Sequence, residues 1–188
     1  MSNIQPLTVI MGEANDDSIR FQKITVEQTL PLRHAVLWPD MPISQVCLPE
    51  DQYGLHLGAF VASGEYPVAV ISLFVEPLPI DKEVPFQTTN GTPVVKAVRF
   101  RKFACDPSYQ GKGIGTNLLS YTVSMAQSEL FGAVLWCDAR TASLEWYKKR
   151  GLLPFSSTFF KGPVEYIRMK MDLREKPEDT DIMEKMSE

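Results

Sequence analysis

Hydrophobic and polar residues alternate along several short segments of the chain, as they do in β-strands that bury one face. Residues 94–105 and 164–173 follow this pattern, and residues 18–25 are predicted to be a short edge strand. Two further segments, 55–62 and 67–76, are continuous runs rich in apolar and β-branched residues. The turn-forming sequence Ser-Gly-Glu-Tyr separates these two runs, so we expect them to pair as a hairpin.

Three other segments repeat their apolar residues at the spacing of an amphipathic helix. These are residues 29–38, 113–130 and 142–150. Pro31 is expected in the first turn of the first helix, where proline is tolerated. Gly132 and Gly151 are the expected stops of the second and third helices, because glycine readily ends a helix. The apolar segment 133–139 between these two helices is predicted to be a buried strand.

This order of elements predicts one mixed α/β domain with a central sheet over residues 18–173. A chain of 188 residues is long enough for one domain with a sizeable core. Residues 76–93 contain four prolines and an Asn-Gly pair, which predicts a long loop. Residues 1–17 are expected to form an N-terminal extension. Residues 174–188, with six acidic and three basic side chains, are expected to form a mobile acidic tail.

The composition is that of an ordinary globular protein, with 44% hydrophobic and 22% charged residues. The net charge of -4, without a concentrated run of lysine and arginine, gives no general attraction to nucleic acid. No apolar run is long enough to cross a bilayer, and residues 1–17 lack the features of a secretory signal. We therefore expect a cytoplasmic protein, with the nucleus as an open alternative, that binds neither nucleic acid nor membrane.

The cysteines argue against a disulfide framework and against a zinc site. Cys47, Cys105 and Cys137 are odd in number, and none stands at the Cys-x-x-Cys spacing of metal ligands. This usage is typical of a reducing compartment. No metal cofactor is predicted.

Three glycines, Gly111, Gly113 and Gly115, alternate in the sequence DPSYQGKGIGTNLL, between a predicted strand and the helix that follows it. The first amides of a helix have no partner inside the helix, and the helix dipole places partial positive charge there. Glycines allow a phosphate to approach these amides without a Cβ in the way. The segment therefore predicts an anion site.

Two common nucleotide-binding loops do not fit this spacing. The Walker pattern requires Ser or Thr after Gly-Lys, but here Gly113 follows Lys112. The dinucleotide fingerprint requires another glycine at position 116 or 118, and these positions are Thr116 and Leu118. What remains is the pattern Gln-x-x-Gly-x-Gly, which begins at Gln110.

This pattern resembles the acyl-CoA pyrophosphate loop of the GNAT family of N-acetyltransferases. The surrounding sequence FRKFACDPSYQGKGIGTNLL is similar to the whole family segment: a strand, a small residue before Asp-Pro, an aromatic residue, the loop and an amphipathic helix. The resemblance covers roughly residues 18–173, and before residue 94 it depends on the order of the elements. It implies a mostly antiparallel twisted sheet flanked by helices and splayed between the fourth and fifth strands.

A second segment, ARTASLEWYKKRGL, is similar to the family's second cofactor motif, Asn-x-x-Ala-x-x-Phe-Tyr followed by a basic turn and Gly-Phe. Trp146 and Tyr147 stand at the Phe-Tyr positions. The sequence departs from the motif at Arg140, which replaces the Asn, and at Ser143, which replaces the Ala. Arg140 could contact a phosphate in place of the Asn, or it could cap the edge of the sheet.

The resemblance implies direct transfer of an acetyl group from acetyl-CoA to a primary amine, either of a small molecule or of a protein lysine or N-terminus. Backbone amides at the end of the fourth strand would hold the pantetheine arm, and those of the glycine loop the pyrophosphate. The implied cofactor-binding residues are Phe103, Ala104, Cys105, Gln110, Gly111, Lys112, Gly113, Ile114, Gly115, Thr116, Arg140 and Tyr147. Family members commonly form homodimers, although no residue of this sequence indicates one.

Tyr147 is the candidate general acid, because a phenol with its ordinary pKa of about 10 stays protonated at neutral pH and can donate to a leaving thiolate. The alternative is that Tyr147 only packs its helix against the sheet. No general base is assigned. Many family members place a carboxylate on the fourth strand, where this chain has the basic residues Arg99, Arg101 and Lys102. Other candidates for the proton transfer are His56, Asp138 and water, and both side chains are interpreted first as structural.

The sequence also raises two alternatives to direct transfer by an enzyme: a cysteine nucleophile and a non-catalytic binding domain. A nucleophilic cysteine needs a base or an electropositive setting. Cys105 lies near the start of a helix and Cys137 in an apolar strand, and both are interpreted as small packing residues. A non-catalytic acyl-CoA-binding domain would use the same loop as a sensor or structural site. Tyr147 favours catalysis, whereas the missing carboxylate on the fourth strand keeps the non-catalytic alternative open.

Overall fold

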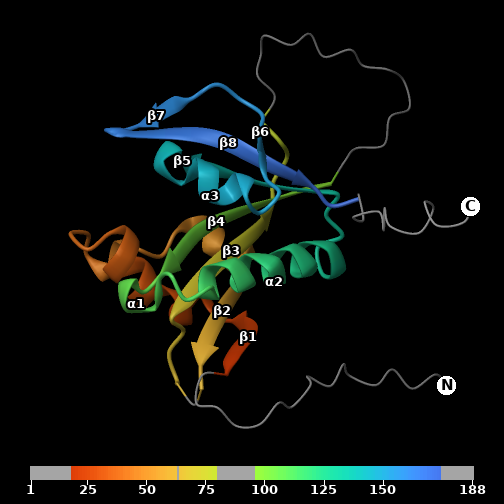
Figure 1. The fold of residues 1–188 in the computed structure, drawn as a ribbon. Helices are drawn as coiled ribbons and strands as arrows, with labels where there is room; N and C mark the ends of the chain where they lie inside the picture. The colour runs from red at the N-terminus through yellow and green to blue at the C-terminus, as the bar shows by residue number, and fades with distance from the viewer. Residues whose placement is uncertain (1–17, 63, 80–95, 175–188) are drawn as a thin grey trace, which may run out of the picture.

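The computed structural model describes residues 18–62, 64–79 and 96–174, and these form one sheet with helices on both faces (Figure 1). The strand order is β1-β2-β3-β4-β5-β8-β6, with β7 paired to β8. The strands are β1 (Ile19–Ile24), β2 (Leu55–Val61), β3 (Ala69–Val75), β4 (Ala97–Cys105), β5 (Val134–Arg140), β6 (Leu153–Pro154), β7 (Phe159–Lys161) and β8 (Val164–Asp172). All recorded pairs are antiparallel except β4 with β5, which is parallel. The predicted mixed α/β fold with a mostly antiparallel sheet is confirmed.

Two helices cover opposite faces of this sheet. These two helices are α1 (Val26–Leu37) and α2 (Ile114–Ser128), and the short helix α3 (Leu144–Lys148) follows β5. Leu118 and Leu119 of α2 lie in the main hydrophobic core with Ile71 of β3. The next residue of β3, Ser72, points to the other face, where it hydrogen-bonds to Arg33 of α1. Figure 1 shows α2 crossing the middle strands of the sheet.

The first helix starts earlier than its sequence pattern predicts. Thr25 caps α1 at its N-terminus: the amide of Gln28 donates to Thr25 Oγ1 at 3.4 Å, and the amide of Thr25 donates to Gln28 Oε1 at 2.9 Å. This reciprocal pair satisfies two amides that would otherwise lack partners. The expectation that Pro31 stands in the first turn is therefore wrong, since Pro31 lies inside the helix.

The two glycines predicted to end helices behave differently. Gly151 follows α3 with φ of 84°, the left-handed conformation expected of a stop. After α2, the left-handed residue is instead Phe131, with φ of 51°. Gly132 is required for another reason, because a Cβ there would lie 2.7 Å from Cγ2 of Val98. α2 itself ends at Ser128, so the predicted stop Gly132 lies beyond the end of the helix and is not its left-handed residue.

Strands β6 and β7 were not predicted, because segments of two and three residues are too short to show alternation. The predicted helix at 142–150 is also shorter, with a 3-10 turn (Thr141–Ser143) before α3. Three other 3-10 turns occur in the described chain, at Ile43–Gln45, Pro49–Tyr53 and Pro107–Tyr109. The predictions for residues 1–17, for most of the 76–93 loop and for nearly all of the acidic tail lie outside the described residues.

Strand β4 has two irregularities that shape the site. It pairs with β5 only at Ala97, Val98 and Arg99, so the edge of its later residues that faces β5 is left unpaired. It also bulges, because Arg101 opposes Ser72 and Ala104 opposes Val70, which leaves two β4 residues opposite Ile71. Lys102, at this bulge, has φ of 57°. The expected splay between the fourth and fifth strands is confirmed.

Candidate active site

The glycine loop places two left-handed glycines directly before α2. Gly111 has φ of 75° and Gly113, the N-cap of α2, has φ of 80°. A Cβ added at either position would meet nothing within 4 Å, so the space beside both residues is open. No side chain caps the start of α2. The loop therefore presents backbone N–H groups at the positive end of a 15-residue helix, a suitable site for an anion.

The other residues of the loop support this conformation. Gln110 Nε2 donates to the carbonyl of Cys105 at 3.1 Å, which ties the loop back to the end of β4. Lys112 Nζ lies 5.0 Å from the centroid of the Tyr109 ring and is exposed at the mouth of the loop. Gly115 differs from the other two glycines: a Cβ there would contact Phe103 at an ordinary 3.5 Å. Gly115 thus provides packing between α2 and β4.

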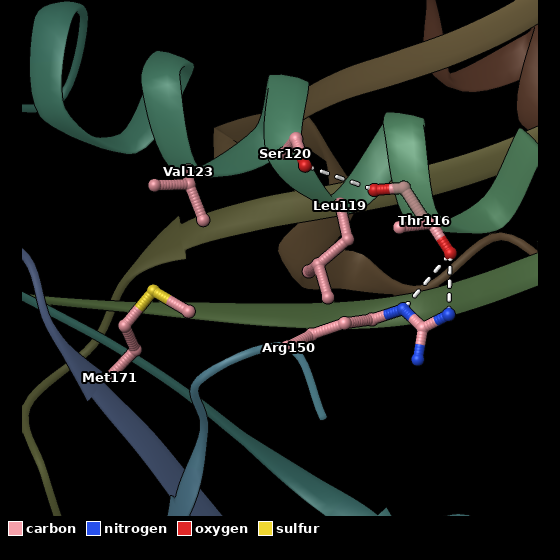
Figure 2. Close-up of a pocket in the computed structure, with 6 residues that line it drawn as sticks. All are labelled: Thr116, Leu119, Ser120, Val123, Arg150 and Met171. Carbon is pink, nitrogen blue, oxygen red and sulfur yellow. Dashed lines mark hydrogen bonds between the residues drawn. The ribbon is translucent and has the colours of Figure 1, made fainter. Parts of the chain in front are cut away.

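Arg150, at the end of the α3 turn, reaches across to the first turn of α2. Its Nε and Nη2 donate to Thr116 Oγ1 at 3.0 and 2.6 Å, and its Nη1 donates to the Trp146 carbonyl at 2.7 Å. The guanidinium also stacks on the Trp146 ring at 3.7 Å. Figure 2 shows the two hydrogen bonds from Arg150 to Thr116, which lie beside a pocket of about 220 Å³. The pocket is lined by Thr116, Leu119, Ser120, Val123, Arg150 and Met171.

Arg150 is the residue of this site that the sequence interpretation missed. The basic turn before Gly151 was interpreted as a helix end and as part of the second motif, but Arg150 itself was given no role in binding. Its contact with Thr116 joins residues 34 positions apart and depends on how α3 packs against α2. A fixed guanidinium next to an anion-binding helix start adds the positive charge that a phosphate needs.

Tyr147 of α3 is buried on the α2 side of the sheet. Its ring lies 5.8 Å from that of Phe100 in β4 and 5.0 Å from that of Trp146. Burial, and then the nearby Cys137 thiol, raise the pKa of Tyr147 above its ordinary value of 10. The phenol therefore stays protonated at neutral pH, as a proton donor must. The same contacts also serve packing, so both interpretations of Tyr147 agree with its position.

The cysteines have the properties of packing residues. Burial raises the pKa of Cys137 and, with Asp106 as a second cause, that of Cys105. A thiol with a raised pKa carries little thiolate at neutral pH and is a poor nucleophile.

Within the described ranges, no three His, Cys, Asp or Glu side chains are grouped as metal ligands. No helix in those ranges is long and apolar enough to span a membrane.

Charged side chains lie in a row along the face of the sheet that α1 covers, opposite α2. We call this group the charged row. Its members are Glu50, Glu76, Arg99, Arg101, Lys102, Asp138, Lys161 and Arg168. Asp138 binds Arg99, and it binds Lys161 Nζ at 2.6 Å. Arg99 Nη1 also binds Glu76 at 2.6 Å. Arg168 Nε lies 3.8 Å from Asp138 Oδ1, so Asp138, one of the candidate bases, has three cations within ion-pair distance. Among the described residues, none donates a hydrogen bond to this Oδ1.

His56, the other candidate base, belongs to a buried network. Arg33 binds Asp51 Oδ2 at 2.8 Å, and its Nη2 donates to Ser72 Oγ at 2.6 Å. His56 Nδ1 lies 2.7 Å from the same Oγ, and Nε2 lies 2.9 Å from the Asp51 carbonyl. The neutral ring with the proton on Nε2 satisfies all these contacts. Burial is the main cause that lowers the pKa of His56. The structural interpretation of this residue is supported.

Lys102 is a half-buried cation of the charged row. Its Nζ lies 4.7 Å from the centroid of the Trp38 ring. Burial first, and then the neighbouring Arg101, lower its pKa to about 8.

Arg140 is exposed at the end of β5, opposite Tyr166 of β8. Because side chains alternate along a strand, Arg140 lies on the same face of the sheet as Asp138. The contact of Arg140 with a cofactor stays a prediction.

Comparison with known proteins identifies relatives of this arrangement. Residues 61–151 match the family model described as an acetyltransferase (GNAT) domain. Among curated protein sequences, none matches the chain. The solved structure of an IAA acetyltransferase from Bacillus cereus is 21% identical, with a TM-score of 0.58 over 82% of this chain and 99% of that one.

Two further structures share the fold. An acyl-CoA N-acyltransferase from Pseudomonas aeruginosa is 14% identical, with a TM-score of 0.56 over 82% of this chain and 99% of that one. A family acetyltransferase from Elizabethkingia anophelis, solved with acetyl-CoA bound, is 16% identical, with a TM-score of 0.55 over 82% and 97% of the two chains. At these identities, the likeness establishes a shared architecture.

Proposed function

Because the chain belongs to the GNAT family of acetyltransferases, we propose that it transfers an acetyl group from acetyl-CoA directly to a primary amine. The family and the shared fold support an acyl-CoA-dependent acyltransferase in general. The finer proposal, with its residue roles, depends on the geometry of β4, α2 and α3. The observation that carries it is the pair of left-handed glycines with open space beside them at the start of α2.

Acetyl-CoA fits this chain as a co-substrate. Its pyrophosphate would accept hydrogen bonds from the amides of residues 111–116, with Lys112 and Arg150 supplying positive charge. The unpaired edge of β4 at residues 103–105 would hold the amide groups of the pantetheine arm. This edge is available only because β5 diverges from β4 after Arg99. A buried backbone group without a hydrogen-bond partner costs free energy. A bound pantetheine arm would supply the missing partners along this edge.

The proposed reaction is a single displacement through a tetrahedral intermediate. The neutral amine nitrogen attacks the thioester carbonyl, so a C–N bond forms, the C–S bond breaks, and CoA leaves as a thiolate. Tyr147 donates its phenolic proton to the sulfur, the proton lost by the amine passes to water, and the tyrosinate regains a proton from water before the next turnover. A phenol is protonated at neutral pH, so Tyr147 holds the proton that it would donate.

The cofactor step is tested by titrating acetyl-CoA into the wild-type protein and into Gly113→Asp. Aspartate tolerates the left-handed conformation better than most residues, and its carboxylate would repel the pyrophosphate. Gly162→Asp is the matched control, since Gly162 has φ of 58° and also has nothing within 4 Å of its Cβ position. We expect the Kd of Gly113→Asp to rise by roughly a hundredfold or more, while Gly162→Asp binds as the wild type does.

Turnover separates an enzyme from a non-catalytic acyl-CoA-binding domain. Release of free CoA thiol in the presence of an amine panel is the readout. Tyr147→Phe keeps the packing of the ring but removes the proton, so we expect kcat to fall by about a hundredfold with the Kd for acetyl-CoA unchanged. Binding without any turnover would favour the sensor alternative, and no binding by the wild type would overturn the proposal.

A further inference from the structure

The charged row carries an excess of positive charge on a protein that is acidic as a whole. It contains five cations, Arg99, Arg101, Lys102, Lys161 and Arg168, and three carboxylates, Glu50, Glu76 and Asp138. The whole chain has a net charge of -4. Local positive charge against this background attracts an anionic ligand.

Most of these cations already have an anionic partner. Arg99 is shared between Glu76 and Asp138, and Lys161 also binds Asp138. Arg101 binds Glu50 at 3.1 Å, with Glu76 at 3.9 Å. Lys102 is the exception: among the described residues, no carboxylate lies within ion-pair distance of its Nζ.

The bulge in β4 is what places Lys102 in this position. In a regular strand, two consecutive side chains point to opposite faces. Here the left-handed Lys102 breaks the alternation, and its Nζ lies over Trp38 at the end of α1, next to Arg101. A left-handed conformation costs a non-glycine residue about 1 kcal/mol or more, and such strain is concentrated at functional sites.

The surroundings of Lys102 resemble those of an anion site before its ligand arrives. The ammonium lies over an aromatic ring, has lost part of its hydration, and is repelled by Arg101 more strongly than it is attracted by Glu50 or by Asp51. A lowered pKa of about 8 reflects this unfavourable setting. An anion placed between Lys102 and Arg101 would offset the cost of burying the ammonium and the repulsion between the two cations. The arginine fork suits a planar carboxylate in particular.

We propose that the acetyl acceptor is an amine that also carries a carboxylate, and that Lys102 and Arg101 bind this carboxylate. The inference rests on the proposed function, because residues 103–105 directly follow Lys102 and would hold the thioester arm. A carboxylate bound at Lys102 therefore anchors the acceptor beside the reacting carbonyl. A lysine in a cation-rich protein segment would be a poor acceptor, because Lys102 and Arg101 would repel the other cations of that segment.

The experiment compares amino acids with their primary carboxamides, for example β-alanine with β-alaninamide, at equal concentrations of the neutral amine. We expect kcat/KM to favour the acids by about tenfold or more. Lys102→Met keeps the aliphatic stem over Trp38 but should bring the ratio of acid to amide close to one, while Lys102→Arg should keep the preference. Lys23→Met, which removes a cation paired with Glu129 away from the charged row, should leave the ratio unchanged.

A binding measurement distinguishes failure of this inference from failure of the proposed function. In the presence of CoA, N-acetyl-β-alanine should bind more tightly than its amide to the wild type and equally to Lys102→Met. That result supports the carboxylate site even where turnover is undetectable. If acids and amides react alike or bind alike, or if Lys102→Met keeps the preference, the inference is overturned, whereas acetylation of the amides alone leaves the proposed function intact.

Discussion

The two faces of β4 recognise their proposed ligands by different means. On the α2 face, the glycine loop and the splayed strand edge offer backbone groups, and Lys112 and Arg150 add charge. On the α1 face, the charged row offers side chains from the Pro49–Tyr53 turn, the residue after β3, and strands β4, β5, β7 and β8. Backbone recognition suits a co-substrate common to a whole family, whereas side-chain recognition suits an acceptor particular to this chain.

The difference also teaches how each face is held in place. The loop depends on the conformation of two glycines and on one hydrogen bond from Gln110. The acceptor face depends on an ion-pair network below it, in which the guanidinium of Arg33 is fully buried. Damage to the first face should weaken binding of acetyl-CoA, and damage to the second should cost stability or acceptor preference.

Arg33→Met should give the largest effect, by breaking the support of the α1 face. It would leave the Asp51 carboxylate, with a side chain only 1% exposed, without its cation. Removing one partner of a buried pair typically costs about 3–5 kcal/mol of unfolding free energy. Urea denaturation measures this loss.

Lys23→Met is the matched control for that experiment. The Lys23–Glu129 pair has side chains 48% and 44% exposed, so its loss should cost no more than about 1 kcal/mol. Equal effects of the two variants would show that burial of the Arg33 network does not support this face.

Arg150→Met sharpens the comparison from the loop face. It removes the guanidinium that contacts Thr116 and stacks on Trp146, so we expect the Kd for acetyl-CoA to rise by about tenfold. Lys149→Met, an exposed neighbour on the same turn, is the control and should bind like the wild type. The ratio of acid to amide acceptors should stay unchanged in both. A change in that ratio would contradict the separation of the two faces.

The smallest effect is a pH dependence of stability through His56. The pKa of His56 is lowered in the folded protein, mainly by burial, so between that pKa and the ordinary value of 6.5 the unfolded chain holds more protons. The unfolding free energy should therefore rise with pH in this window and fall on acidification below about 6.5, by at most about 1.4 kcal/mol per pH unit.

Denaturation of the wild type and of His56→Gln between about pH 5 and 7.5 measures this slope. The difference between the two proteins isolates His56 from His34, the only other histidine of the chain. A wild-type stability that is flat over this range, or identical slopes in both proteins, would contradict the neutral, buried histidine.

The strands and the glycine loop were predictable because their signals are local. Alternation at β4 and β8, and continuous apolar runs at β2 and β3, follow directly from which face each residue buries. Two predictions, the start of α1 and the role of Gly132, were wrong because they depend on contacts with other residues. The start of α1 depends on the reciprocal Thr25–Gln28 cap, and Gly132 is required by Val98, which approaches from another strand.

By itself, the sequence determined the order of the elements and the position of the glycine loop at the start of α2. Both depend on backbone conformation and on spacing between near neighbours. Only the tertiary structure decided the environment of the charged side chains. Asp138 lies between Arg99 and Lys161, His56 is enclosed by Arg33 and Ser72, and a bulge turns Lys102 toward Trp38. The effect of a charge depends on its burial and on distances through space, and these are set by how distant segments pack.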